Sequence, residues 1–468
     1  MDDELTLCEP SAVPVAYWHD TAACVHRLSQ RPWFVLLDSC RFCDTAGRYD
    51  IVAWDPVTTF VTESEVTRIF ENGRLFESTA DPFGLVRERL GRETRHPEFP
   101  FTGGAIGYFG YDLSRRIERL RATAVHDIQI ADMAVGIYDR FLLVDHDEGR
   151  AWFVHRGLQQ AEVHDAVARI EIPRTVTPAA FSTRFTVTSP VRRDMSYRQY
   201  ATAFRRIKRY IRDGDCYQVN FAQRFSASAE GDPWDAYLRL RNLNAAPYAA
   251  FLKTPGAAVL SSSPERFLRV SGGEVQTKPI KGTRPRSRNP VDDRRLAVEL
   301  LQSAKDRAEN LMIVDLLRND LGKTCAFGTI EVPELFAVES FARVHHLVST
   351  VRGRLQEDIH ALDVLRGCFP GGSITGAPKL RAMEIIEELE PARRGIYCGA
   401  IGYVSHDGQM DTNIAIRTLI HHRERLYCWA GGGIVIDSEL DGEYQESLDK
   451  AAAMLNLFAD AEIENMDR

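Results

Sequence analysis

Two acidic pairs at helical spacing are the first candidates for chemistry in the sequence. Asp306 and Glu309 lie three residues apart, as do Glu443 and Glu446. Residues three apart share one face of a helix, so each pair would present two carboxylates together. Two such helices facing each other would suit Mg²⁺, which binds a few carboxylates, keeps water and bridges to anionic substrates. Each pair alone is also typical of a solvated face, and Lys450 is well placed for a surface ion pair with Glu446.

Lys281 lies in the segment Lys278-Pro279-Ile280-Lys281-Gly282-Thr283. The proline stiffens the backbone on one side and the glycine lets it bend on the other, so the amine can be aimed at a target. A lysine in this setting is usually an exposed loop charge. Glu265 precedes a strand that turns back towards Lys281, which puts an acid within reach of the amine. The alternative for Glu265 is a charge pair with Arg266 at the end of a strand.

Three further features could hold an anionic ligand. The backbone N–H groups of Gly431-Gly432-Gly433 could bind a carboxylate or phosphate, although a triple glycine is more often a turn or bulge. Arg417 lies in an otherwise apolar predicted strand and needs an anionic partner, which is either a structural Asp or Glu or a substrate carboxylate. His346 and Tyr397, judged alone, are typical of structural residues.

The elements that would position these residues indicate an α+β protein. Apolar residues at helical spacing predict a helix over 196–213, and a long, interrupted helical stretch is predicted over 292–320. Antiparallel strands joined by short turns are predicted over 399–405, 412–420 and 426–429. Neighbouring strands with short turns favour antiparallel sheets flanked by helices over a doubly wound α/β fold. The proline-rich stretch from about 172 to 194 is the best candidate for a linker.

The bulk composition excludes several classes of protein. The chain has 468 residues, of which 44% are apolar, and a net charge of −8. It has no long basic run, which argues against a nucleic-acid partner. The acidic start at Met1–Glu4 and the lack of a long apolar stretch predict no secretion signal, no membrane span and a cytoplasmic protein. Nine cysteines, an odd number in a long chain, indicate reduced thiols rather than a disulfide framework.

The chemical segments occur together, and in the same order, in the chorismate-utilising enzymes. The sequence resembles that family over nearly its whole length, most densely at Gly214–Asn220, Ala308–Asp315, Phe369–Lys379 and Ala430–Val435. The resemblance implies an α+β fold with large antiparallel sheets in a sandwich-like core of two subdomains. It also implies an N-terminal region over 12–172, like that of anthranilate synthase component I, and a catalytic region over 194–460.

Two positions separate the branches of this family. Anthranilate synthases have alanine where this sequence has Lys281, and enzymes that form isochorismate or salicylate have a water-activating lysine where it has Gln218. The sequence is therefore most similar to the aminodeoxychorismate synthase branch, component I. That branch aminates chorismate at C4 and supplies 4-aminobenzoate for folate synthesis. The alternatives are an anthranilate synthase component I and a non-catalytic subunit that binds chorismate or tryptophan.

The resemblance implies a role for each candidate residue. Lys281 attacks C2 of chorismate to form a covalent intermediate while Glu265 protonates the departing C4 hydroxyl. Mg²⁺, held by Glu309 and Glu446 with support from Asp306 and Glu443, binds the ring carboxylate. The implied substrate-binding residues are Gly282, Thr283, His346, Tyr397, Arg417, Gly431, Gly432, Gly433 and Lys450.

The resemblance also implies a partner and a second pocket. The sequence shows no Cys-His-Glu amidotransferase module, so ammonia would come from a separate glutamine amidotransferase subunit, component II of the synthase. The N-terminal region resembles the part of the family that houses a tryptophan pocket, where tryptophan is either a feedback inhibitor or a structural ligand. The residues that match its walls are Ser39, Ala46, Gly47, Arg48, Tyr49, Pro247, Tyr248 and Ala249.

Overall fold

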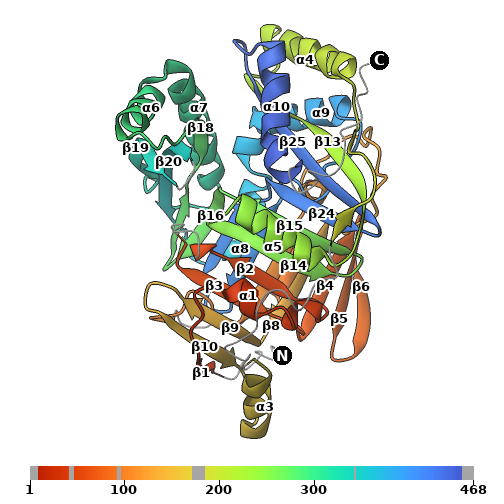
Figure 1. The fold of residues 1–468 in the computed structure, drawn as a ribbon, viewed down its shortest axis with the longest axis vertical. Coiled ribbons are helices and arrows are strands. Elements are labelled where there is room, and N and C mark those ends of the chain that lie inside the picture. The colour runs from red at the N-terminus through yellow and green to blue at the C-terminus, as the bar shows by residue number, and fades with distance from the viewer. Residues whose placement is uncertain (1–8, 42–46, 92–95, 171–184, 342–343, 456–468) are drawn as a thin grey trace.

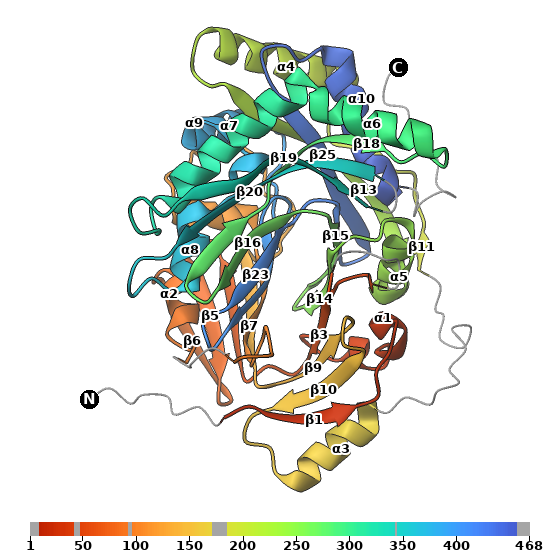
Figure 2. The same cartoon turned by 90° about the vertical axis from the view of Figure 1, so that its left-hand side faces the viewer.

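Two large antiparallel β-sheets with helices around them make up the protein. The computed structural model describes residues 9–41, 47–91, 96–170, 185–341 and 344–455. Every pair of named strands is antiparallel, and the main hydrophobic cluster contains residues of both sheets. The α+β prediction with large antiparallel sheets is confirmed (Figures 1 and 2).

The first sheet has 13 strands drawn from both halves of the chain. In spatial order its strands are β1 (Ser11–Val15), β10 (Arg150–His155), β9 (Arg140–Asp145), β3 (Tyr49–Ala53), β2 (Val35–Asp38), β14 (Tyr248–Thr254), β15 (Ala257–Ser263), β24 (Thr418–His422), β25 (Arg425–Ile434), β13 (Gln218–Glu230) and β11 (Thr186–Val187). Two short strands, β12 (Arg192–Arg193) and β21 (Gly376–Ala377), also pair with β13. The pairing of β2 with β14 joins the N-terminal strands to the C-terminal ones.

The second sheet has 12 strands and is mixed in the same way. Its spatial order is β18 (Ile280–Pro285), β20 (Val344–Arg354), β17 (Glu274–Thr277), β16 (Arg266–Ser271), β23 (Met410–Ile414), β22 (Ala400–Ser405), β7 (Gly104–Phe109), β8 (Met133–Tyr138), β4 (Thr58–Glu63), β5 (Val66–Glu71) and β6 (Arg74–Ser78), with β19 (Glu331–Ser340) beside β20. Both sheets thus cross the linker, and the regions 12–172 and 194–460 stay a prediction about the sequence.

Ten α-helices are named in the described part of the chain. They are α1 (Thr21–Cys24), α2 (Pro82–Arg87), α3 (Gln160–Ile170), α4 (Tyr197–Arg212), α5 (Pro233–Leu243), α6 (Pro290–Gln302), α7 (Ala304–Leu321), α8 (Ala361–Cys368), α9 (Lys379–Leu389) and α10 (Leu440–Leu455). The helix predicted over 196–213 is confirmed as α4, which begins with a capping box between Ser196 and Gln199. The interrupted helix is confirmed as α6 and α7, and Ser303 ends the first and caps the second.

One predicted strand is wrong. The stretch 412–420 is two strands in different sheets, because β23 ends at Ile414 and β24 begins at Thr418. Arg417 has φ 49°, a left-handed conformation that no regular strand adopts, and the chain crosses from one sheet to the other at this point.

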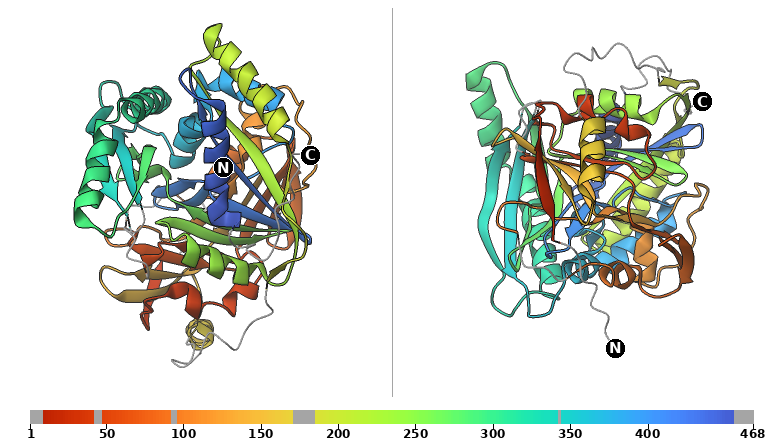
Figure 3. Two further views of the ribbon diagram at one scale, coloured as in Figure 1. Left: turned by 45° about the horizontal axis from the view of Figure 1, so that its top comes forward. Right: turned by 90° about the horizontal axis from the view of Figure 1, so that it is seen from below.

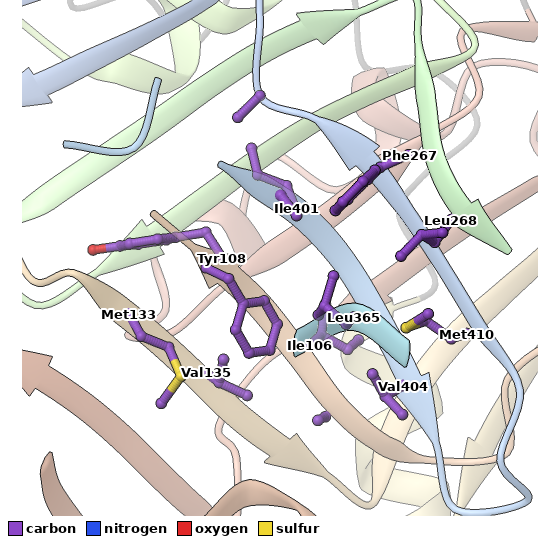
Figure 4. Packing of buried hydrophobic residues seen from close by; sticks show 14 of the residues in the cluster. Ile106, Tyr108, Met133, Val135, Phe267, Leu268, Leu365, Ile401, Val404 and Met410 are labelled. Carbon is purple, nitrogen blue, oxygen red and sulfur yellow. The ribbon is translucent and has the colours of Figure 1, made fainter. Parts of the chain in front are cut away.

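The core that holds the second sheet in place is shown in Figure 4. Apolar side chains of β7, β8, β16, β22 and β23 pack with Leu365 of α8. Every cysteine in the described ranges is a free thiol, and Cys43 lies outside them. Within the described residues, no helix is both long enough and apolar enough to span a membrane.

Helices α6 and α7 stand with β18 to β20 beside α10 and β25 (Figures 1 and 3). Glu309 on α7 and Glu443 on α10 are close enough for each charge to affect the other. The acidic residues picked out in the sequence therefore come from two elements that face each other.

Candidate active site

Lys281 and Glu265 lie on either side of one serine. The pairing of β18 with β20 shifts register between Ile280 and Thr283, and Gly282 has φ 83°, so the strand bulges at Lys281. The Lys281 Nζ donates a hydrogen bond to the Ser373 carbonyl at 3.1 Å. The Ser373 hydroxyl donates to Glu265 Oε1 at 2.8 Å. The structure thus brings together the acid and the amine that the sequence singled out.

Both groups are shifted towards their neutral forms. Burial lowers the pKa of the Lys281 amine, and the Lys450 charge lowers it further against the opposing carboxylates. Burial also raises the pKa of the Glu265 carboxyl, although Lys281 opposes this shift. A neutral amine is the form that can attack carbon, and a protonated carboxyl is the form that can act as an acid.

The four candidate metal-binding carboxylates lie on α7 and α10 next to this centre. Burial raises the pKa of Glu309, and the nearby Asp306 and Glu443 charges add to the rise. Burial also raises the pKa of Glu443, to which Glu446 contributes. Burial opposes the shift of Glu446, but the Lys450 ammonium 2.7 Å away lowers its pKa overall. The expected ion pair of Glu446 with Lys450 is present, and each of the two side chains keeps a little under half of its surface exposed.

The carboxylates are gathered only loosely. No three or more His, Cys, Asp or Glu side chains in the described ranges form a ready-made metal cluster. Asp306 is bound by Arg284 at 3.2 Å and packs on Gly282, where an added Cβ would lie 2.9 Å from the Asp306 Cβ. Asp306 thus also supports the bulge that carries Lys281. Carboxylate oxygens are the donor type that a hard cation such as Mg²⁺ prefers. A bound cation would also relieve the electrostatic repulsion between Glu309 and Glu443.

The three glycines form part of a strand rather than a turn. Gly431, Gly432 and Gly433 all belong to β25, and β24 pairs with β25 only as far as Cys428. One edge of β25 therefore runs past β24, and the Lys450 Nζ donates to the Gly431 carbonyl there at 3.1 Å. A Cβ on Gly432 would lie 3.0 Å from Glu443 Oε2 and 3.5 Å from Glu446 Oε1. The absence of a side chain lets both carboxylates approach the strand.

Arg417 is a half-buried cation without a carboxylate partner among the described residues. Its Nη1 donates to Asn244 Oδ1 at 3.3 Å, and it forms no ion pair with any Asp or Glu in the described part of the chain. Burial lowers the pKa of this guanidinium. Of the two partners considered from the sequence, a structural carboxylate is absent among those residues, and a substrate carboxylate stays a prediction.

Tyr397 and His346 are both buried. Tyr397 stacks on Trp429 with ring centroids 6.1 Å apart, and burial raises its pKa well above the usual value. The Thr283 hydroxyl is 2.9 Å from His346 Nδ1, opposite it in the β18–β20 ladder. Burial and the Arg417 charge lower the pKa of His346 to about 4, so the ring is neutral.

A large cavity lies apart from the reaction centre. It has a volume of about 860 Å³, and seven of the eight candidate tryptophan-binding residues line it; Ala46 is outside the described residues. The seven are Ser39, Gly47, Arg48, Tyr49, Pro247, Tyr248 and Ala249. Arg48 is held in its wall by both oxygens of Asp145, at 2.9 and 2.7 Å.

Comparison with known proteins gives the family. The family model described as chorismate binding enzyme matches residues 35–456. The chain belongs to this family. The chorismate-binding enzyme is 50% identical to aminodeoxychorismate synthase component 1 of Klebsiella aerogenes, covering 92% of this chain and 94% of that one. It is 48% identical to the protein of the same name from Escherichia coli (strain K12), covering 95% and 98%. Among solved structures, anthranilate synthase component I from Streptococcus pneumoniae TIGR4 matches with a TM-score of 0.78 and 34% identity, over 87% of this chain and 92% of that one.

Ser373 is the residue of this chorismate-binding enzyme that reasoning from the sequence missed. It joins Lys281 to Glu265 with two different atoms, its carbonyl and its hydroxyl. The available signal was its position within Phe369–Lys379, one of the segments that most resemble the family. Asn244, the contact of Arg417, carried no signal because only the fold brings it near.

Proposed function

We propose that this chain converts chorismate and ammonia to 4-amino-4-deoxychorismate, as an aminodeoxychorismate synthase component 1. The observation that carries the proposal is the desolvated Lys281 amine linked through Ser373 to the buried Glu265. It occurs in a chain 48–50% identical to proteins of that name over more than nine-tenths of its length.

The proposed reaction has two displacements. The neutral Lys281 amine forms a bond to C2, the ring double bonds shift, and the C4 hydroxyl leaves as water with the proton of Glu265. Ammonia then forms a bond to C4, the double bonds shift back, and the lysine leaves C2. The enolpyruvyl group is retained throughout. The lowered pKa of Lys281 and the raised pKa of Glu265 support these two roles, because each group acts in its neutral form.

The substrate carboxylates would be held by groups around the centre. Arg417 offers a guanidinium that pairs with no carboxylate of the described residues and can bind a substrate carboxylate with two parallel hydrogen bonds. Tyr397, the open edge of Gly431–Gly433 and the Lys450 ammonium would add to this binding, while Gly282, Thr283 and His346 would line the ring of chorismate.

Mg²⁺ is the proposed cofactor. Glu309 and Glu446 would hold it, with Asp306 and Glu443 in support, and it would supply positive charge for the ring carboxylate of chorismate. The fit rests on the oxygen donors of two facing helices and on the raised pKa values of Glu309 and Glu443, which burial and neighbouring carboxylates cause. The loose arrangement suits a cation that takes part of its coordination from water and substrate.

The proposed source of ammonia is a glutamine amidotransferase subunit. The relatives' designation as component 1 supports the existence of a partner subunit. Free ammonium should replace that subunit in part.

One incubation separates the candidate functions. The chain is mixed with chorismate, Mg²⁺ and ammonium, and the products are analysed by mass spectrometry. Retention of the pyruvyl group is expected; release of pyruvate with anthranilate would make the chain an anthranilate synthase component I, and no turnover would make it a regulatory subunit. K281A should also lose a lysine adduct trapped from the wild type, and an adduct that persists in K281A contradicts the role of Lys281.

Tryptophan is the second proposed ligand, for the cavity of about 860 Å³. The seven described wall residues that match the family's pocket support it, and Arg48 and Tyr49 give the wall both charge and aromatic surface. Isothermal titration decides the matter: measurable heat is expected, and no heat at millimolar tryptophan would end the proposal.

A further inference from the structure

Helix α4 carries a row of four arginines on one face. Arg198, Arg205, Arg209 and Arg212 are separated by seven, four and three residues, the spacing of one helical stripe. All four are exposed, and none forms an ion pair with a residue in the described ranges. The opposite face of α4 is buried through Tyr200, Ala203, Phe204 and Ile207. We call Arg198, Arg205, Arg209 and Arg212 the arginine row.

The acidic side chains of the neighbouring helices that contact α4 bind residues outside the arginine row. Arg206, on the flank of the helix, pairs with Glu388 of α9, which also accepts from the Tyr210 hydroxyl. Asp441 of α10 accepts a hydrogen bond from the Tyr197 hydroxyl. The helix itself contains no acidic residue over Tyr197–Arg212. The arginine row therefore faces solvent without an ion pair in the described ranges, and Asp213 at the C-cap is the acidic residue next to its end.

Helix stability accounts for only part of the row, because Arg209 and Arg212 lie in the last turn, where the helix dipole favours cations. Like charges three or four apart on a helix repel each other, which costs roughly 0.2–0.5 kcal/mol a pair. Arg198 also lies in the first turn, where the helix dipole disfavours a cation. Four exposed arginines on one face, without an ion pair in the described ranges and in a chain with a net charge of −8, form a surface complementary to an acidic partner. Arginine suits this use because its planar guanidinium binds carboxylates with two hydrogen bonds.

The row is fixed to the elements that carry the reaction centre. Lys208 of α4 donates to the Ser438 carbonyl at 2.8 Å, in the loop between β25 and α10. At its C-terminal end, α4 leads through a short turn into Tyr217, which is 72% exposed, and Gln218, which is fully buried. The Gln218 amide has no hydrogen-bond partner in the described part of the chain and lies against Gly433 of β25. A partner on α4 would thus lie over the start of β13, next to the centre that consumes ammonia (Figures 1 and 3).

We propose that the arginine row is the docking surface for an acidic face of the subunit that supplies ammonia. This inference rests on the proposed function, because it assigns a place on this chain to that subunit. A protein partner fits better than a polyanion, because the overall negative charge of the chain repels nucleic acid and anionic lipid at long range.

The test uses the full chain and the glutamine amidotransferase component of the same organism. R205E/R209E reverses the middle of the row. The control R74E/R239E makes the same change in net charge at exposed arginines of β6 and α5, on other faces. Product is measured with ammonium and, separately, with glutamine and increasing amidotransferase, and binding is measured directly by titration calorimetry.

Ammonium-supported activity should be unchanged in both double variants. Two quantities should rise at least tenfold in R205E/R209E and not in the control: the amidotransferase concentration that gives half-maximal glutamine-supported activity, and the dissociation constant of the complex. In the wild type, both quantities should rise with the salt concentration. Equal behaviour of the two double variants, or no binding to the wild type, overturns the docking surface. Loss in R205E/R209E of binding to anionic phospholipid vesicles, with amidotransferase binding intact, also overturns it. Absence of product with ammonium in the wild type contradicts the proposed function instead, while calorimetry still decides the docking.

Discussion

Glu265 and Arg266 are neighbours in sequence, and their side chains contact two different groups of residues. The Glu265 carboxylate accepts a hydrogen bond from Ser373 in the reaction centre, at 2.8 Å. The Arg266 guanidinium lines the separate cavity, where it lies 5.0 Å from the Tyr248 ring centroid and pairs with Asp411 at 2.9 Å. One peptide bond at the beginning of β16 therefore separates a residue of the cavity wall, Arg266, from the proposed acid, Glu265.

Glu265→Gln tests the acid. A glutamine keeps the shape and cannot protonate the departing hydroxyl, so we expect kcat to fall roughly 10²–10⁴-fold. Glu265 acts in its protonated form, and burial raises its pKa. Wild-type activity should therefore fall as pH rises through that raised pKa, and E265Q should not show this fall. The measurement is kcat/KM against pH at constant free ammonia.

Arg266→Gln is the matched control for Glu265→Gln. The R266Q variant should keep the fall in activity at high pH that Glu265 causes. It should bind a ligand in the cavity more weakly, because the Arg266 side chain lines that cavity. Loss of this fall in R266Q but not in E265Q would contradict the division between the two sites.

Arg417→Met separates function from stability. Arg417 is half-buried, and its guanidinium is desolvated without a carboxylate partner among the described residues. Removing it therefore takes away a desolvation cost and should leave the unfolding midpoint unchanged or higher. The KM for chorismate should rise at least tenfold, since the enolpyruvyl carboxylate loses its proposed partner. Denaturant unfolding and steady-state kinetics check the two halves. A marked loss of stability with unchanged KM would make Arg417 structural.

Much of the local structure was predictable from the sequence, and long-range placement was not. The period of α4 and the break at Ser303 are local signals that the structure confirms. The crossing at Arg417 was missed because its flanking residues are apolar in both sheets, and apolar periodicity does not report which sheet a strand joins. The proline and glycine beside Lys281 in the sequence indicated an irregular backbone, and the structure has a bulge there. The partner of Lys281, Ser373, lies 92 residues away, a contact that only the packing of α7 and β18 creates.

His346→Asn tests a buried neutral histidine. Its pKa of about 4 lies below the ordinary value of 6.5, because burial and Arg417 disfavour the charged ring. The unfolded chain binds this proton first, so stability is full above pH 6.5 and falls towards pH 4, by up to about 3 kcal/mol at 1.36 kcal/mol per pKa unit. Asparagine keeps an acceptor near Thr283 and does not titrate. The variant should lose less stability than the wild type over this pH window in urea unfolding, and parallel curves would contradict the assignment.

Gly432→Ala tests the approach of the carboxylates to β25. The added Cβ would lie 3.0 Å from Glu443 Oε2 and 3.5 Å from Glu446 Oε1, so one or both side chains must move. If Glu446 helps to hold Mg²⁺, the Mg²⁺ concentration for half-maximal activity should rise at least tenfold. The control is Gly442→Ala on α10, where a Cβ meets nothing within 4 Å; alanine there should raise helix stability by roughly 0.5–1 kcal/mol without changing the Mg²⁺ requirement. An equal Mg²⁺ requirement in G432A and the wild type would show that these carboxylates do not set the metal affinity.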